Sequence, residues 1–294
     1  MRGLRRIGKS LLCRFGGWLG DGVYLRLMYY FQTGRVLHLR RPVTFNEKLQ
    51  WLKLHDRREE YTTMVDKYAV KGYVGKMIGE EYIVRTLGVW ERVEDIAWEE
   101  LPGEFVLKTT HGGGGKGVVV CWDKERLDRG AAEEELRRAM KRSLYRSYRE
   151  WPYKGVKPRV MAEELLKDGD GGVIKDYKFL CFDGEPMYCV VMSGRWGEFT
   201  NDFFDMEWNR LGVTVKGIGC SATPPRKPHN FERMRGLARR LSAGIRHVRV
   251  DFYEVGERVY FGELTFYSTS GYGEFRPGEW DRILGERIKL KIEN

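Results

Sequence analysis

A glycine-rich stretch between two strand-like runs constrains the fold of this chain more than any other feature. Residues 105–108 and 118–122 are largely apolar, and β-branched and aromatic residues of this kind are typical of strands. Five of the nine residues from Thr109 to Gly117 are glycines, which let successive backbone N–H groups approach an anion closely. The stretch therefore predicts a β-hairpin whose loop binds phosphate, with Lys108 and Lys116 beside it. A flexible surface hairpin without a ligand is the simpler alternative.

Three common glycine loops do not fit this sequence. A Walker loop ends in Gly-Lys followed by Ser or Thr and then a helix, whereas Gly117 follows Lys116 here. A Rossmann loop opens a helix, whereas the β-branched run 118–120 predicts a strand. A protein kinase has similar glycine spacing between two strands, but its lysine follows the loop, and this chain has neither H-R-D-L-x-x-x-N nor D-F-G. What remains is a hairpin whose lysine, Lys108, precedes the loop.

The composition of the 294-residue chain predicts a globular protein with two or three subdomains. No apolar run approaches the roughly 18–20 residues that span a bilayer, and Arg14, Asp21 and Arg26 interrupt the pattern of a secretory signal. The five cysteines are odd in number and lack metal-type spacing, which predicts buried thiols in a reducing compartment. We therefore expect a cytoplasmic protein.

Positive charge is concentrated at the amino-terminal end of the chain. Residues 1–41 contain nine Lys or Arg residues and one acid, Asp21, and so carry most of the net charge of +10. With the apolar residues between them, they predict a basic amphipathic arm that contacts an anionic membrane surface or steers an anionic polymer. A solvated basic face on helices packed against the body is the alternative. Nucleic acid is not an expected partner, because the basicity is confined to one end and no RNP, zinc-finger or KH sequence is present.

Helices are predicted between this arm and the glycine hairpin. Residues 44–47, Thr-Phe-Asn-Glu, form a capping-box pattern that begins a helix. A longer helical pattern over about 61–78 contains Lys67 and Lys71. The Leu-Pro-Gly sequence at 101–103 then marks a boundary before the hairpin.

Two acidic residues face each other in a second predicted hairpin near the carboxyl end. The runs 248–253 and 259–266 both predict strands, and a turn centred on Glu257 would place Asp251 opposite Glu263. Two facing carboxylates repel unless a cation or a proton joins them. Mg²⁺ carried by nucleotide phosphates takes one or two carboxylates, so this hairpin and the glycine loop together fit one Mg·ATP site. An exposed hairpin with scattered charges is the alternative.

These features together resemble the ATP-grasp ligases. The shared features are a strand lysine before a glycine hairpin, a strand ending in Glu-x-x-Leu at 163–166, and a terminal hairpin with Arg-x-Asp and Glu. Six phrases of the sequence more narrowly resemble the TupA-like ATP-grasp family, which is named for teichuronopeptide synthesis and met in surface-polysaccharide gene clusters. In chain order they are Thr44–Leu54, Asp66–Tyr68, Phe105–Lys108, Asp176–Phe182, Arg249–Tyr253 and Tyr260–Phe266.

The resemblance implies an α+β ATP-grasp fold with the ATP cleft between two α+β subdomains, preceded by a helical N-terminal region. The expected divisions are a basic amphipathic arm (1–43), a helical region (44–100), the small subdomain with the glycine loop (101–162), and the C-terminal subdomain with the metal site (163–294).

The resemblance also implies the residues of the site. Lys108 is expected on the α- and β-phosphates, assisted by Lys67 or Lys71, with the glycine loop as a cover and the base and ribose held after the Glu-x-x-Leu strand. The full ATP-binding set is Lys67, Lys71, Lys108, Gly112, Gly113, Gly114, Gly115, Lys116, Gly117, Glu163, Glu164, Leu166 and Asp170. Asp251, Glu263 and Thr265 would hold the metal, Lys178 would face phosphate or substrate, and Arg249 would stabilise charge at the acyl centre. Thr265 departs from the family pattern, which has Asn there, and a hydroxyl is a weaker and shorter ligand.

The activity implied is an ATP-dependent carboxylate–amine ligase that uses ATP and Mg²⁺, with Mn²⁺ as an alternative metal. Its partners would be a carboxylate (a uronic acid polymer, a sugar precursor or an amino acid) and an amine, and its product would modify a cell-surface polysaccharide or its precursor. Two alternatives remain. One is a glycosyltransferase-type polysaccharide biosynthesis protein, and the other is a non-catalytic ATP-binding module, suggested by Thr265.

Overall fold

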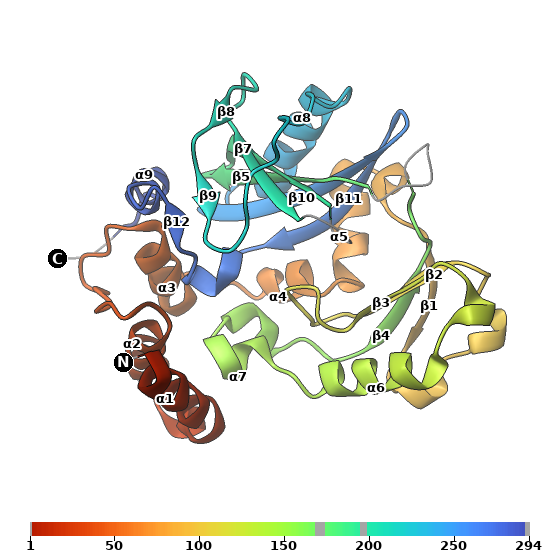
Figure 1. The fold of residues 1–294 in the computed structure, drawn as a ribbon, viewed down its shortest axis with the longest axis horizontal. Helices are drawn as coiled ribbons and strands as arrows, with labels where there is room; N and C mark the ends of the chain where they lie inside the picture. Colours follow the sequence, from red (N-terminus) through yellow and green to blue (C-terminus); the bar gives the residue numbers. More distant parts are fainter. Residues whose placement is uncertain (1, 168–173, 195–198, 292–294) are drawn as a thin grey trace.

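The computed structural model describes residues 2–167, 174–194 and 199–291 of the chain. Two antiparallel sheets dominate it (Figure 1): a small sheet in the order β1-β4-β2-β3 and a large sheet in the order β11-β10-β5-β6-β7-β8. A two-stranded sheet, β12-β9, accompanies the large one. The short 3₁₀ helices of the described residues are η1 (Gly16–Trp18), η2 (Glu80–Tyr82), η3 (Val93–Asp95), η4 (Trp98–Glu100), η5 (Lys124–Arg126), η6 (Trp151–Lys154) and η7 (Ser268–Gly271).

The basic amino-terminal segment folds as two antiparallel helices, α1 (Arg2–Phe15) and α2 (Asp21–Thr33). Gly8 lets the helices approach, because a Cβ there would lie 2.6 Å from the ring of Phe31. Gly34 ends α2 in the left-handed conformation at φ 76°. Tyr24 of α2 is buried and donates its hydroxyl to the carbonyl of Ser147 at 3.0 Å. The segment is therefore a helical hairpin attached to the body through α2.

The predicted capping box is confirmed at the start of α3 (Phe45–His55). The side chain of Thr44 accepts from the backbone N–H of Glu47, whose carboxylate accepts from the N–H of Thr44 in return. This helix packs against α9 (Trp280–Arg287), where a Cβ at Gly285 would lie 2.4 Å from a backbone carbonyl of the segment before α3. Residues at the two ends of the chain thus lie side by side.

The helix predicted over 61–78 is wrong in one respect, because the structure has two helices there. They are α4 (Glu60–Val65) and α5 (Ala69–Ile78). Asp66 lies at the break, and its carboxylate accepts from the backbone N–H groups of two following residues at 2.9 and 3.1 Å. Such local side-chain bonding competes with a continuous helix. Lys67 therefore lies between two helices instead of on a helical face.

The small sheet consists of β1 (Thr86–Trp90), β2 (Phe105–Thr109), β3 (Val118–Cys121) and β4 (Val160–Glu163). The glycine hairpin is confirmed, with Lys108 opposite Val118. The expectation that residues 44–100 are helical is wrong at β1, which pairs antiparallel with β4. The helices α6 (Arg129–Met140) and α7 (Leu144–Tyr148) follow β3. Leu136 of α6 and Leu107 of β2 share one apolar core, so the opposite face of the sheet carries Lys108.

The large sheet carries the main apolar core and the acidic hairpin. Its strands are β5 (Asp176–Phe182), β6 (Glu185–Ser193), β7 (Thr200–Phe204), β8 (Arg210–Leu211), β10 (His247–Val255) and β11 (Arg258–Thr265). The small strands β9 (Thr214–Val215) and β12 (Phe275–Arg276) pair with each other. Helix α8 (Phe231–Ser242) buries its apolar face against this sheet, and Phe179, Val250 and Phe252 point into the same core. The alternate positions on β5 and β10 therefore form the other face.

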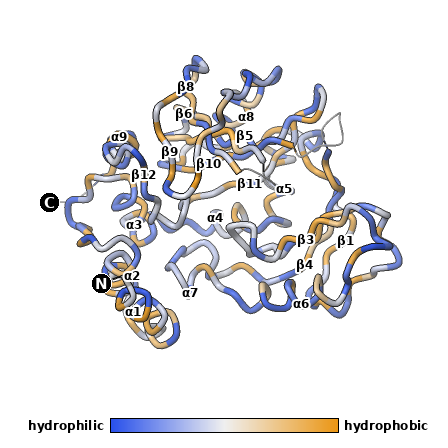
Figure 2. The backbone as a smooth tube through the Cα atoms, in the orientation of Figure 1, coloured by the Kyte–Doolittle hydropathy of each residue, from blue (hydrophilic) through white to orange (hydrophobic). Residues whose placement is uncertain are grey.

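Hydrophobic residues occur along the strands of both sheets, whereas many connecting loops are hydrophilic (Figure 2). Among the described residues, no helix combines the length and apolar character that crossing a bilayer requires.

Candidate active site

The acidic hairpin is built by β10 and β11, and it places Asp251 directly opposite Glu263, as predicted. The predicted turn centre at Glu257 is wrong, however, because Gly256 and Glu257 together form the turn and its centre lies between them. A bulge restores the pairing, since the register shifts by one residue at Gly262. A Cβ at that position would lie 3.2 Å from the carbonyl of Asp251, which explains why glycine occupies the bulge.

Two cations hold the carboxylate of Asp251, which is 1% exposed. Arg249 lies on the same strand and face, and donates from Nε to Oδ1 and from Nη2 to Oδ2, both at 2.7 Å. Lys178 of β5 is paired with Asp251 in register and donates to Oδ2 at 2.6 Å. Lys178 also lies 3.3 Å from Asp176. Burial of this carboxylate is therefore compensated by three charge-assisted hydrogen bonds from two cations.

Glu263 is held by cations from two different parts of the chain. Its Oε1 accepts from Arg249 at 2.7 Å and from the hydroxyl of Thr265 at 3.2 Å, and its Oε2 accepts from Lys67 at 2.9 Å. Burial opposes the charged form, but Lys67 and Arg249 hold the pKa of Glu263 well below its usual range. The two carboxylates in turn raise the pKa of Arg249 against the effect of burial. Glu263 is thus an ionised carboxylate at neutral pH.

Glu163, at the end of β4, forms a second cation–carboxylate cluster. Its Oε1 lies 2.6 Å from Nζ of Lys71, and its Oε2 pairs with Lys108. Burial would raise the pKa of Glu163, but the two lysines lower it overall. Burial lowers the pKa of Lys71, which also donates to the carbonyl of Val84 and the hydroxyl of Thr86 at 2.7 Å each. The cluster therefore contains two lysines for one carboxylate.

Lys67 connects the glycine hairpin with the acidic hairpin. Its backbone N–H donates to the carbonyl of Thr110 at 2.9 Å, while its side chain reaches Glu263. The neighbouring Asp66 pairs with Arg159 at 2.7 Å, next to the start of β4. The break between α4 and α5 thus places a lysine between the two sheets.

The glycine loop has backbone conformations that require glycine at several positions. Gly114, Gly115 and Gly117 have φ angles of 65°, 73° and 70°. A Cβ at position 117 would also lie 2.4 Å from the Cβ of Ala139 on α6, and one at Gly113 would lie 3.1 Å from a side chain of α7. The loop therefore turns close to these two helices, with Lys116 exposed on it.

One protein family matches most of the chain. The family described as TupA-like ATPgrasp matches residues 47–289. The chain belongs to the TupA-like ATP-grasp family. This confirms the resemblance found in the sequence, and with it the α+β ATP-grasp fold, preceded by the helices that lie before residue 47. No curated protein matches the chain.

Several solved structures are similar to this TupA-like ATP-grasp protein at low identity. D-alanine–D-alanine ligase from Bacillus anthracis, complexed with ATP, is 14% identical over 69% of this chain and 54% of its own, with a TM-score of 0.40. The corresponding ligase from Helicobacter pylori is 16% identical over 83% and 69%, with a TM-score of 0.42. The ATP-grasp ligase PsnB, complexed with minimal precursor, Mg and ADP, is 12% identical over 83% and 66%, with a TM-score of 0.40. The chain spans little more than half the length of the first of these ligases.

The segment 163–166, which the resemblance implies holds the base and which is called the hinge below, begins where β4 ends. The backbone N–H of Glu164 donates to the carbonyl of Arg85 at 3.0 Å, while its side chain is exposed. Leu166 is half-buried. Asp170, expected near the ribose, lies outside the described residues. The structure therefore places three of the four residues named from the sequence for the base and ribose: Glu163, Glu164 and Leu166.

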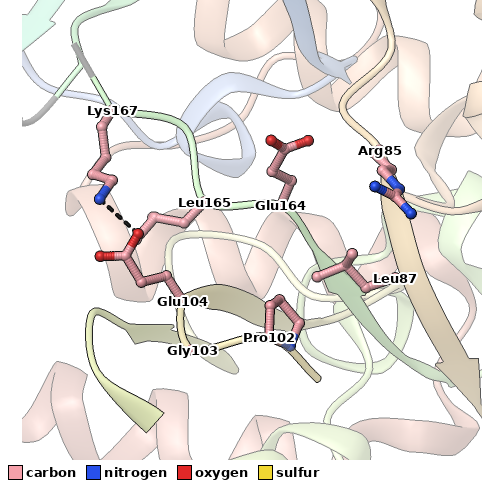
Figure 3. A pocket seen from close by; sticks show the side chains of 8 residues that line it. All are labelled: Arg85, Leu87, Pro102, Gly103, Glu104, Glu164, Leu165 and Lys167. Atoms are coloured by element: carbon pink, nitrogen blue, oxygen red, sulfur yellow. Dashed lines mark hydrogen bonds and ion pairs between the residues drawn. The ribbon is translucent and has the colours of Figure 1, made fainter. Parts of the chain in front are cut away.

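Two cavities of about 480 Å³ flank the hinge and share Arg85 and Glu164. Figure 3 shows the first, which lies against Leu87 and Pro102, with the Glu104–Lys167 ion pair at its edge. The second reaches η2, the turn residue Glu257 and the first three residues of β11. Neither cavity is lined by the two carboxylate clusters, so both belong to the hinge end of the site.

The oxygen donors of the acidic hairpin fit a magnesium ion that arrives with a nucleotide. Asp251 and Glu263 supply two opposed carboxylates, with the hydroxyl of Thr265 beside them. Within residues 2–167, 174–194 and 199–291, no group of three or more His, Cys, Asp or Glu side chains forms a complete metal cage. Mg²⁺ at nucleotide sites uses one or two carboxylates and completes its shell with phosphate oxygens and water. The residues therefore fit Mg²⁺ as part of Mg·ATP.

The structure adds two acids that the sequence analysis gave no role. Asp176, which is buried, lies two residues before Lys178 on the same face of β5. The alternation of Asp176 and Lys178 with apolar residues in the run 176–182 was the sequence signal that could have indicated a role for Asp176. Asp66 positions the break that places Lys67 between two helices, and its Asp-x-x pattern before Ala69 resembles a helix start.

Proposed function

We propose that this TupA-like ATP-grasp protein is an ATP-dependent carboxylate–amine ligase that forms an amide through an acyl phosphate. The observation that carries the proposal is the opposed Asp251–Glu263 pair, held by Arg249 and Lys178 on one face of the large sheet. Carboxylates surrounded by fixed cations suit a site where a metal and phosphate charge meet, because each charge then has a partner before and after binding.

The triphosphate would lie between the two cation–carboxylate clusters. Lys108 and Lys71 would bind phosphate oxygens, because together they exceed the charge of Glu163 by one. Lys67 would assist, since it already contacts both the glycine hairpin and Glu263. The loop 112–117 would cover the phosphates, with Lys116 as a further cation.

The nucleoside would lie at the hinge, in the second of the two cavities. This cavity contains Glu164, Arg85 and Tyr260. Tyr260 pairs with Tyr253, which alternates with Asp251 onto the same face of β10. Glu263 lies three positions after Tyr260 on β11, about 10 Å of strand at roughly 3.3 Å per residue. The cavity and the carboxylates thus lie along one strand in the order that a nucleotide requires.

Mg²⁺, or Mn²⁺ in its place, would be held by Asp251 and Glu263 with Thr265 beside them, and would neutralise phosphate charge when bound. The chain's own cations would do the remaining electrostatic work. Arg249 and Lys178 lie within 2.7 Å of these carboxylates, in positions fixed by strand register. Such preorganised charges stabilise negative charge that develops during a reaction.

The proposed reaction has two steps. First, an oxygen of the substrate carboxylate attacks the γ-phosphorus of ATP, the bond to the bridging β–γ oxygen breaks, and an acyl phosphate and ADP form. Second, the amine attacks the acyl carbon, inorganic phosphate leaves, and the amine nitrogen loses a proton to solvent. Lys178 would orient the transferred phosphate and Arg249 would offset the charge of the tetrahedral acyl centre. Closure of the glycine loop would exclude water, which otherwise hydrolyses the acyl phosphate.

The substrate class rests on the resemblance to the TupA-like family alone. We infer a carboxylate from a uronic acid polymer, a sugar precursor or an amino acid, joined to an amine of an amino acid or peptide. The product would modify a cell-surface polysaccharide or its precursor on the cytoplasmic side, where ATP is present.

Trapping with hydroxylamine tests the proposal. The protein would be incubated with Mg·ATP, a candidate uronic or amino acid and hydroxylamine, and the expected products are a hydroxamate and an equal amount of ADP. The Glu263→Gln protein is the matched control and should give neither. ATP binding without ADP release for any carboxylate in the screen would contradict a ligase and favour a non-catalytic ATP-binding module. Displacement of ATP by UDP-sugars at similar concentrations would favour a glycosyltransferase.

A further inference from the structure

The outward face of the α1–α2 hairpin is apolar and uncovered. On α1 a stripe of large apolar side chains recurs every three or four residues, and each is 53–75% exposed: Leu4, Ile7, Leu11 and Phe15. On α2 a second stripe is 39–51% exposed: Val23, Leu27 and Tyr30. Trp18, in the turn between the helices, is 84% exposed. We call these eight residues the hairpin face.

Both stripes lie on the same side of the hairpin. The helices touch through Gly8 with Phe31 and through Leu12 and Gly16 with Tyr24, which fixes the contact line. Successive residues of a helix are rotated by about 100° around its axis. On this basis each apolar stripe is rotated by roughly 80–85° around its own helix from the line of contact between the two helices. Because the helices are antiparallel, the two rotations bring both stripes to the same side of the hairpin. Leu25 and Tyr29 of α2 pack on the opposite side, against the body.

The hairpin face is therefore one continuous surface that points away from the body. The hairpin lies at the periphery of the molecule (Figure 1), and apolar and polar residues alternate along α1 (Figure 2).

Positive charge borders this surface without acidic compensation. Arg14 and Arg26 are exposed and fall at the outer edges of the two stripes on the helical wheel. The one acid among residues 1–41, Asp21, is engaged by Arg57 at 2.6 Å and by Arg149 at 3.0 Å. The carboxylate of Asp21 is thus paired with arginines of the body and helps to attach the hairpin to it.

We propose that the hairpin face docks onto the anionic surface of a lipid bilayer. Apolar side chains would enter the boundary between headgroups and acyl chains, while the basic residues remain at the level of the anionic headgroups. Trp18 and Tyr30 have the amphipathic rings that favour this depth. A second copy of the chain fits the face less well, because it would bring two strongly basic segments together.

Docking would also orient the candidate active site. Buried Arg149, just after α7, donates to the carbonyl of Gly16 at 3.1 Å, and its guanidinium lies 3.8 Å from the ring centroid of Tyr24. Helix α7 also lies against the glycine loop at Gly113. A bilayer on the hairpin face would therefore hold the loop end of the site near the membrane. The proposal itself does not depend on the ligase activity.

Co-sedimentation of the full chain with lipid vesicles tests this proposal. Binding is expected to phosphatidylcholine vesicles that contain phosphatidylglycerol, with little binding to phosphatidylcholine alone and a decrease as salt is added. The pair Arg14→Gln and Arg26→Gln should weaken association by about 30-fold, roughly fivefold per charge. The pair Leu11→Ser and Trp18→Ser should weaken it at least as much, because it removes large apolar area.

Trp122→Ser is the matched control, because Trp122 is also exposed (41%) but follows β3 on the small sheet. It should bind vesicles like the wild type, and thermal unfolding should be unchanged in all these surface variants. Two results would overturn the proposal. One is equal binding of neutral and anionic vesicles or none to either, and the other is equal loss in the Trp122→Ser control. A dimer that depends on Leu11 and Trp18, without vesicle binding, would assign the face to a second copy instead.

Discussion

The two cation–carboxylate clusters of this protein differ in how many carboxylates they bring together. On the small sheet, one carboxylate, Glu163, is shared by two lysines that come from α5 and β2. On the large sheet, two carboxylates, Asp251 and Glu263, lie on a single hairpin. The first cluster therefore offers lysines around a single carboxylate and is suited to phosphate, whereas the second brings two carboxylates together among its cations and is suited to a metal.

The origin of the two clusters differs as well. The carboxylates of the large sheet are fixed by strand pairing and by the bulge at Gly262, so their separation is set by backbone geometry. The lysines of the small sheet meet Glu163 from separate elements, so their distance from it can change when a ligand arrives. A rigid carboxylate pair and an adjustable lysine cluster are what the proposed Mg·ATP site requires.

Removing a carboxylate from the large sheet should have the largest effect. Asp251→Asn and Glu263→Gln should each lower the rate of ADP formation by about 10²–10³-fold, because the metal that would neutralise phosphate charge loses a carboxylate ligand. The matched control is Glu254→Gln, on the same hairpin but bonded to Asn230. It should retain activity, and a comparable loss there would mean that any change on this hairpin disrupts the fold.

The dependence of stability on pH should distinguish the carboxylate clusters from the buried histidine of the large core. Burial lowers the pKa of His247, between Phe45 and Phe182, to about 4. This imidazole is neutral in the folded protein. Its contribution to the free energy of unfolding is complete above the unfolded-state pKa of about 6.5 and is lost as the pH falls to about 4. The loss is at most about 3 kcal/mol. The pKa values of Glu163 and Glu263 are lowered, so their contribution is lost only as pH falls below about 4.5.

Urea unfolding across this pH range measures both windows. His247→Asn should flatten the decline between pH 6.5 and 4.5, and Glu163→Gln should flatten only the part below. An unchanged slope in His247→Asn above pH 4.5 would contradict the assignment of that window to His247.

Substitution of the lysines should have a smaller effect, confined to ATP affinity. Lys108→Met and Lys71→Met should each raise the KM for ATP by about tenfold to a hundredfold, as expected for loss of a hydrogen bond to a charged group. Lys116→Met should raise it by no more than about fivefold, because this lysine is exposed. Steady-state kinetics measures the KM for ATP of each variant. A larger effect at Lys116 than at Lys108 and Lys71 would assign the main phosphate contact to the loop instead of the sheet.

The smallest effect is expected at Thr265. Its hydroxyl donates to Glu263 at 3.2 Å, a weak contact at the edge of the metal site. Thr265→Ala should raise the Mg²⁺ concentration for half-maximal ADP formation by about fivefold, through loss of one hydrogen bond. Dependence of the rate on Mg²⁺ measures this directly. A loss as large as that of Glu263→Gln would make Thr265 an essential ligand.

Local patterns carried most of what the sequence could predict. The opposition of Asp251 and Glu263 follows from strand alternation and a short turn, although it also needed the bulge at Gly262 to offset a turn misplaced by half a residue. The capping box at Thr44 and the glycine hairpin are likewise set by neighbouring residues.

Contacts between distant segments could not be read from such patterns. Strand β1 is held by pairing with β4, more than 60 residues later in the chain, so its own sequence did not identify it. Asp66 breaks a helix that its neighbours favour, because its carboxylate satisfies the following N–H groups. The pairing of Glu163 with Lys71 and Lys108 depends on the packing of three elements, and sequence indicated these residues only as nucleotide ligands.

Calorimetric titration with ATP, in the presence and absence of Mg²⁺, tests the central claim that the two clusters form one Mg·ATP site. For a single site, Mg²⁺ should strengthen ATP binding in the wild type, Glu263→Gln should remove this dependence, and Lys108→Met should weaken binding with or without the metal. ATP binding that ignores Mg²⁺ in the wild type, or that keeps its full Mg²⁺ dependence in Glu263→Gln, would contradict it.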